Sequence, residues 1–162
     1  MEKVSINKNM HLSEHFTLGE VTKTSVKTTD GNIPSHVAIE NLKNLCENWL
    51  EDLRYSHNTL YGDTADEPII ITSGYRSPEV NKRVGGSPTS NHLTGCAVDI
   101  RCIGIEQAIR YASILLDIAD GTKRDYDELL IERNARGNYW LHFAVRPENN
   151  RRKTAIILVN SE

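Results

Sequence analysis

An α+β fold, with a mostly antiparallel sheet and helices packed on one of its faces, is predicted from two observations. Two long segments carry apolar residues at helical spacing, and three β-rich runs joined by polar connections close the chain. Helices early and strands late in a sequence are typical of this class. The 162 residues predict a single domain over 1–162 that buries its own core, with 1–33 as an N-terminal arm packed on it.

Helices are predicted in three segments. Residues 34–55 and 105–121 repeat their apolar side chains about every 3.6 residues, which predicts two long amphipathic helices. Gly121 stands where the second of these should stop. Between them, residues 78–84 predict a short helix that Pro78 opens in its first turn.

Strands are predicted from five short runs rich in β-branched and aromatic residues, namely 69–73, 96–102, 127–132, 139–145 and 154–159. The first of them should be buried, because three isoleucines follow one another in it. A loop rich in glycine, serine and proline precedes the second. The connections 133–138 and 146–153 look like hairpin turns, so the last three strands should form an antiparallel meander.

Composition and charge narrow the function. The formal charge of −3 and a pI near 6.1 give no basic field for phosphate, so nucleic-acid binding is not expected. No segment reaches the roughly 20 apolar residues of a membrane span, and the N-terminus lacks the apolar core of a signal peptide. We therefore expect synthesis in the cytoplasm and no membrane partner. A monomer is expected, because no exposed apolar stripe stands out.

Strand parity places two polar side chains on one face of the sheet. Side chains alternate between faces, and in 96–102 the alternate residues that begin at Cys96 are apolar, which leaves Asp99 on the other face. In 139–145 the same argument puts His142 opposite an apolar set. If both apolar faces pack into one core, Asp99 and His142 project together from the far side of the sheet.

A third ligand could come from the loop before the second strand. This loop carries His92, which could fold over Asp99 and His142. Two imidazoles and one carboxylate, with a fourth position for water, are typical of a catalytic zinc site. Zinc would lower the pKa of that water toward neutrality and polarise a carbonyl group. The spacing of His92 and Asp99 alone leaves another interpretation open, a surface histidine beside a strand-edge aspartate.

The segment SGYRSPEVNKRVGGSPTSNHLTGCAVDI resembles the motif of the zinc-dependent D-Ala-D-Ala carboxypeptidases and L-alanyl-D-glutamate endopeptidases, metallopeptidase family fifteen. Members typically read S-G-Y-R-S, a Gly-Gly loop, S-x-H-x-x-G-x-A-x-D and W-x-H, and this chain matches each part. The N-terminal stretch HLSEHFTLGEVTKTS looks like that of phage and Bacteroides-type members. The resemblance therefore covers nearly the whole chain, and it implies a Hedgehog/DD-peptidase-like fold.

Carried over to this sequence, the resemblance implies that one zinc ion is bound by His92, Asp99 and His142. It also implies that Arg76 lies beside the ion and holds the substrate carbonyl oxygen as charge develops, although a structural ion pair is the alternative. Substrate contacts are expected from three further residues, with loop stabilisation as the alternative for the first and packing on the sheet for the last: Ser90, Tyr75 and Trp140.

The general base is the weakest part of the match. Many members carry an acid three positions before the last histidine, where this chain has Tyr139, whose ordinary pKa of about 10 makes it a poor base. The run YDELLIE resembles the F-D-Q-L-I-x-E of related members and offers Asp127 and Glu132. Parity favours Glu132 if Leu129 and Ile131 pack into the core. Strand register is not readable from the sequence, so Asp127 stays a candidate.

These features predict a zinc peptidase that hydrolyses a bond in the stem peptide of peptidoglycan, as an endolysin or a wall-remodelling enzyme does. Carboxypeptidase and endopeptidase action both stay open. Without a signal peptide the protein would reach the wall by lysis, through a holin or in a virion, which favours a phage or prophage origin. One alternative is a non-catalytic zinc module that binds wall peptides or a protein partner, which Tyr139 supports. Another is a virion component without metal.

Overall fold

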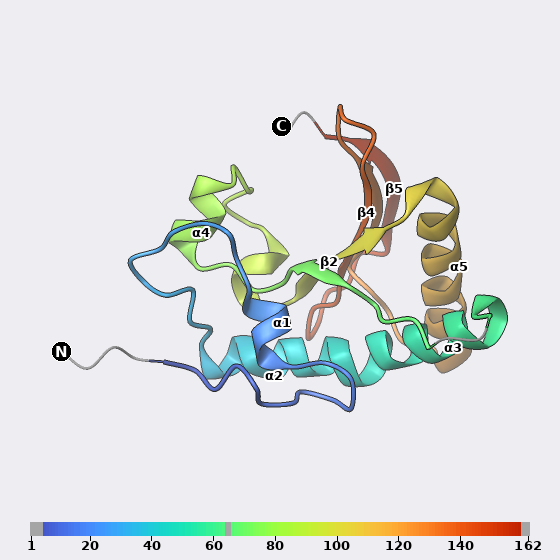
Figure 1. Cartoon of the computed structure of the whole chain (residues 1–162), viewed down its shortest axis with the longest axis horizontal. Coiled ribbons are helices and arrows are strands. Elements are labelled where there is room, and N and C mark those ends of the chain that lie inside the picture. The colour runs from blue at the N-terminus through green and yellow to red at the C-terminus, as the bar shows by residue number, and fades with distance from the viewer. Residues whose placement is uncertain (1–4, 64–65, 160–162) are drawn as a thin grey trace.

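The computed structural model describes residues 5–63 and 66–159, and over them the chain has an α+β fold built on a five-stranded mixed sheet (Figure 1). The first four residues of the predicted arm and the last three of the predicted domain lie outside the described residues. The sheet order is β1-β2-β4-β3-β5. The strands are β1 (Ile71–Ser73), β2 (Ala97–Cys102), β3 (Glu128–Arg133), β4 (Tyr139–Ala144) and β5 (Lys153–Leu158).

The last strand does not form the predicted hairpin. β3 and β4 pair antiparallel across a tight turn, as expected, but β5 runs parallel to β3 and does not pair with β4. The reason is that β4 lies between β2 and β3, so both of its edges are already hydrogen-bonded. The connection 146–153 therefore passes β4 and delivers Lys153 to the free edge of β3, where its N–H donates to the Asp127 carbonyl at 2.9 Å.

The first long helix continues past its predicted end. It runs without a break through α2 (His36–Leu45), a π-helical turn η1 (Cys46–Leu50) and α3 (Glu51–Tyr61). The expectation of an end near residue 55 was wrong, because the next buried position on this face after Leu53 is a histidine, His57, which a search for apolar residues passes over.

The remaining helices agree more closely with the sequence. α4 (Pro78–Arg83) begins after Ser77, and α5 (Gly104–Thr122) covers the second amphipathic segment. Gly121 lies inside the last turn of α5 and does not end it; the chain leaves the helix at Lys123, which has a left-handed φ of 55°. Among the described residues, no helix combines the length and the apolar character that crossing a membrane requires.

The core lies on one face of the sheet, between β2–β4 and the two long helices. Trp49 of the first helix meets Phe143 of β4 edge-on, with ring centroids 5.1 Å apart. α5 packs along the same face, whereas α4 and the loop after it lie on the other side of the sheet (Figure 1). The apolar faces predicted from parity are the buried ones, with Val98, Ile100 and Leu141 fully enclosed.

The N-terminal arm packs at the β1 edge of the sheet. It includes α1 (Leu18–Thr22), and Phe16 and Val21 are buried in the core. The Val21 carbonyl accepts the N–H of Tyr75 at 2.7 Å, and a Cβ on Gly74 would lie only 2.2 Å from that same oxygen. Glycine at position 74 therefore permits the close approach that fixes the SGYRS segment.

Asp127, just before β3, binds side chains of the loop before β2 and of the connection between β4 and β5. Its carboxylate is completely buried and accepts from Arg151 at 2.8 and 3.0 Å and from the Asn91 amide at 2.7 Å. Arg146 lies 3.1 Å from the same group. Burial would raise the pKa of Asp127, but these donors, Arg151 foremost, lower it to about 2. The anchor fixes the loop that carries His92 and the start of β5.

Replacing Asp127 with asparagine should lower the free energy of unfolding by about 3 kcal/mol, measured in urea at neutral pH, because it leaves guanidinium groups without their buried partner. Since Arg151 is half exposed, the loss should fall at the lower end of the usual range. The matched control is Asp120→Asn, which breaks an exposed pair with Arg152 and should leave the free energy of unfolding close to the wild-type value. Equal losses in the two variants would contradict the anchoring role.

His57 makes the fold sensitive to acid. Its ring is 4% exposed, packs between Tyr61 and Tyr111, and its Nε2 has no hydrogen-bond partner among the described residues. Burial lowers the pKa of His57; the Arg110 charge lowers it further and Glu67 opposes it. The neutral ring therefore stabilises the fold above the unfolded-state pKa of about 6.5, and that contribution is lost as the pH falls below it.

His57→Phe should remove this acid sensitivity while keeping an aromatic ring between the tyrosines. The difference in unfolding free energy between variant and wild type, measured at about pH 7.5 and about pH 5, should shift in favour of the variant at the lower pH. A difference that does not change with pH would show that His57 is not the titrating group.

Candidate metal centre

A cavity of about 360 Å³ opens on the face of the sheet opposite α5. Its floor is made by side chains of β2, β3, β4 and β5, and its wall by the segment from Arg76 to His92. Asp99 and His142, which parity placed on this face, are directly paired in the β2–β4 register. His92 reaches them from η2 (Asn91–Thr94), the short 3₁₀ helix of the loop.

Two backbone contacts hold η2 against the rest of the molecule. The Arg76 N–H donates to the His92 carbonyl at 3.0 Å, which links the loop to the SGYRS segment. Gly95 ends η2 with a left-handed φ of 72°, and a Cβ there would lie 2.4 Å from the Ala38 carbonyl. A glycine is required at this position, and it lets η2 pack directly on α2.

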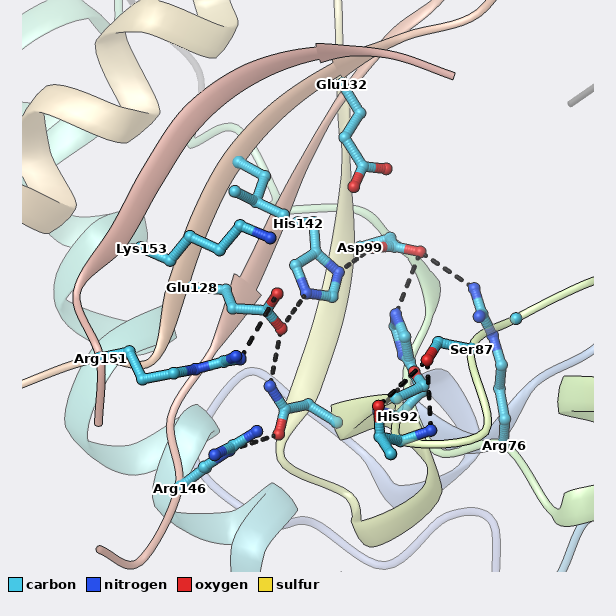
Figure 2. Close-up of a pocket in the computed structure, with 15 residues that line it drawn as sticks. Arg76, Ser87, His92, Asp99, Glu128, Glu132, His142, Arg146, Arg151 and Lys153 are labelled. Carbon is cyan, nitrogen blue, oxygen red and sulfur yellow. Dashed lines mark hydrogen bonds and ion pairs between the residues drawn. The ribbon is translucent and has the colours of Figure 1, made fainter. Parts of the chain in front are cut away.

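The two imidazoles converge on the Asp99 carboxylate (Figure 2). His142 Nδ1 lies 3.0 Å from Asp99 Oδ1, and His92 Nε2 lies 3.4 Å from Asp99 Oδ2. One ligand atom from each of the three residues lies within 4.8 Å of the others. Bonds of about 2.0 to 2.2 Å to a tetrahedral ion would set neighbouring ligand atoms about 3.3 to 3.6 Å apart, so the spacing is close to what such an ion needs.

The outer nitrogen of each imidazole has its own partner. His92 Nδ1 lies 2.6 Å from the Gly74 carbonyl, and His142 Nε2 lies 3.1 Å from Glu128 Oε1. With the ring proton on these outer atoms, the lone pairs of His92 Nε2 and His142 Nδ1 face Asp99. Metal-binding histidines are normally oriented in this way. The residues therefore fit a divalent cation in both donor type and direction.

Charge at this centre favours a cation. Although burial would raise the pKa of Asp99, the two imidazoles, His92 foremost, hold it well below the usual range. Burial would likewise lower the pKa of His142, but its hydrogen bonds to Asp99 and Glu128 raise it to about 10. The group as a whole binds positive charge, whether as protons or as a metal ion.

Glu132 lines the same cavity, beside the three candidate ligands (Figure 2). Its register partner on β4 is Trp140, whose indole N–H donates to Glu132 Oε2 at 2.5 Å. Burial and the nearby Asp99 charge raise the pKa of Glu132. Trp140 itself is half-buried and does not line the cavity. In the structure its indole orients Glu132.

Arg76 and Ser90 lie on the wall of the cavity. Arg76 Nη2 is 3.3 Å from Asp99 Oδ2, and its Nε donates to Ser73 at 3.1 Å. The ion pair that the sequence left as an alternative is therefore present, and the guanidinium still borders the open space. Ser90 Oγ accepts the His92 N–H at 3.2 Å, which is the loop-stabilising role.

Two sequence expectations for the site are corrected. Asp127 is fully buried and occupied by its arginine and asparagine partners, so it is not placed to act as a base. Tyr75 is 8% exposed and packs in the hydrophobic core, not against a substrate. The expectation for Tyr75 came from the motif resemblance, which carries no information on how this side chain packs after the end of β1.

Tyr139 occupies the position at which the motif resemblance led us to expect an acid. In β4 it lies on the same side as Leu141, packed against the core, and the Arg133 guanidinium sits 5.8 Å above its ring. An odd number of positions separates residue 139 from His142, so the two side chains lie on opposite faces. A tyrosine at this position therefore removes nothing from the cavity.

The sequence reasoning missed several polar residues of the cavity, and two of them, Glu128 and Asn91, support the candidate ligand His142. The Asn91 amide donates to Glu128 at 2.6 Å and to Asp127 at 2.7 Å, so it links the metal group to the buried anchor. Glu128 lies four positions before Glu132, so alternation along one strand places both on the same face, and that was the available signal. No pattern pointed to Asn91, whose role depends on how the loop folds.

Comparison with known proteins identifies the family. The family model described as Peptidase M15 matches residues 14–121, which is 108 of the 162 residues. The match contains Arg76, His92 and Asp99 and ends before Glu132 and His142. No curated protein matches the chain. The chain belongs to the peptidase M15 family, and this assigns it to the metallopeptidases.

Proposed function

We propose that the protein is a zinc-dependent peptidase that hydrolyses a bond in the stem peptide of peptidoglycan. The observation that carries the proposal is the convergence of His92, Asp99 and His142 beside Glu132 in one open cavity. The family supports hydrolysis of a peptide bond, and the motif resemblance supports the wall peptide as substrate. We also propose a Hedgehog/DD-peptidase-like fold and action at the cell wall, after release from the cell or in a virion.

His92 Nε2, an Asp99 carboxylate oxygen and His142 Nδ1 would hold the ion. Zinc bound there would lower the pKa of a water molecule and polarise the substrate carbonyl. Gly74 and Glu128 keep the two imidazoles in the orientation that binding needs. Three protein ligands would leave a further position on the side of the cavity.

Glu132 would accept a proton from the attacking water. A carboxylate with a raised pKa is a stronger base than an ordinary glutamate, which suits this task. The Trp140 N–H holds one carboxylate oxygen and leaves the other free to face the cavity. Arg76 would attract the carbonyl oxygen as negative charge develops on it, from its fixed position between Ser73 and Asp99.

Of the alternatives, a non-catalytic zinc module loses its main support. That interpretation depended on a missing acid at Tyr139, whose side chain faces the core. The acid that the mechanism needs is available on the neighbouring strand, at Glu132. A virion component without metal leaves the arrangement of the three candidate ligands without a purpose.

Glu132→Gln should lower kcat on purified peptidoglycan by about 100- to 10,000-fold, because it removes the base and keeps the hydrogen bond to Trp140. Zinc content should stay at the wild-type value. Released fragments are followed by mass spectrometry, which also identifies the bond cleaved. The matched control is Glu106→Gln, an exposed residue of α5 that pairs with Arg110 and does not line the cavity, so the rate should stay unchanged. Wild-type rates in the Glu132 variant would rule out this mechanism.

A further inference from the structure

One side of the cavity is lined by cations that the proposed mechanism does not use. They are Arg146, Arg151 and Lys153, which precede or begin β5. In the parallel register Lys153 lies beside Glu128, and Leu130 of the same strand lies beside His142. Side chains of Lys153, Glu128 and His142 therefore leave neighbouring strands on the same face.

The acids nearby are already occupied. Asp127 is bound by Arg146 and Arg151 together. Glu128 Oε1 is shared between His142 and the Asn91 amide, and its other oxygen lies 3.9 Å from Arg151. These two carboxylates face three cations, so the β5 side of the cavity carries an excess positive charge.

Lys153 is the cation that provides this excess. No described residue forms a salt bridge or hydrogen bond with its ammonium group, whereas both arginines are held by Asp127. Figure 2 shows its side chain directed toward the same space as Glu128 and His142, on the side of the metal group away from Arg76. Its backbone pairs with β3 at the start of β5, and its N–H donates to the Asp127 carbonyl at 2.9 Å, so the side chain projects from a fixed position.

We propose that Lys153, assisted by the half-exposed Arg151, binds a free carboxylate of the substrate close to the scissile bond. The inference rests on the proposed function and adds a substrate requirement to it. If the carbonyl of the scissile bond is held near Arg76 and Asp99, the next part of the peptide extends toward β5. There it meets the ammonium group of Lys153. In stem peptides the carboxylate could be the C-terminal one or the α-carboxylate of the D-glutamate.

The test is calorimetric binding of synthetic L-Ala-γ-D-Glu-L-Lys-D-Ala-D-Ala to the zinc-loaded Glu132→Gln protein, which spares the ligand. Three forms are compared: the free acid, the C-terminal amide and the form with the D-glutamate α-carboxylate amidated. One amide should bind about 10- to 100-fold more weakly than the acid, as expected for loss of a charged hydrogen bond. Which amide does so identifies the source of the carboxylate.

Adding Lys153→Ala should bring all three affinities to within about twofold of one another, and Lys153→Arg should restore the contrast. The matched control is Lys43→Ala, which removes an exposed ammonium group of α2 and should leave the contrast intact. Equal binding of the three forms, absence of binding, or a contrast that survives Lys153→Ala would overturn the inference. Failure of wild type to cleave, with the contrast intact, would overturn only the proposed function.

Discussion

The buried Asp99 carboxylate, set between two imidazoles, is the constraint on which the rest of the structure depends. A carboxylate at this depth is unfavourable unless positive charge faces it. The direct pairing of β2 and β4 supplies His142, η2 supplies His92, and Arg76 closes a third side. Each of these contacts comes from a different segment, so the site exists only when the whole sheet and its loop are assembled.

The contacts that support the site also join segments distant in the sequence. The Val21 carbonyl fixes the SGYRS segment, whose Gly74 carbonyl orients His92. On the other side, Asp127 fixes Asn91, and Asn91 holds the glutamate that orients His142. The N-terminal arm and the start of β5 therefore support the candidate metal centre, although neither provides a candidate ligand. The Gly74 carbonyl and the Glu128 carboxylate therefore set the orientation of both imidazoles.

Three carboxylates share the free face of the sheet, and their surroundings give them different tasks. Asp99 is ionised by its imidazole neighbours, and Glu128, through its bond to His142, has its pKa lowered to about 2. Among the described residues, Glu132 has only an indole N–H as hydrogen-bond partner, and it is buried near the negative Asp99, so its pKa is raised. Environments that separate the pKa values of neighbouring acids in this way are typical of active sites.

Parity could predict the faces of the strands, because alternation depends only on local backbone geometry. It placed Asp99 and His142 together and favoured Glu132 correctly as a residue of the cavity. It could not predict that β5 would join β3, since one edge of β4 is filled by its hairpin partner β3 and the other by β2, which is distant in the sequence. The Lys153 position follows from that pairing, as the Asn91 contacts follow from the loop. Burial of His57 depended on tertiary packing in the same way.

The most direct measurement for the central claim is the zinc content and affinity of the purified protein, by competition with a chelator of known affinity. The structure predicts one tightly bound zinc ion per chain, and loss of that ion in His142→Ala, which removes one of three ligands. Binding of zinc with equal affinity by the wild type and by the variant, or no binding by the wild type, would contradict it.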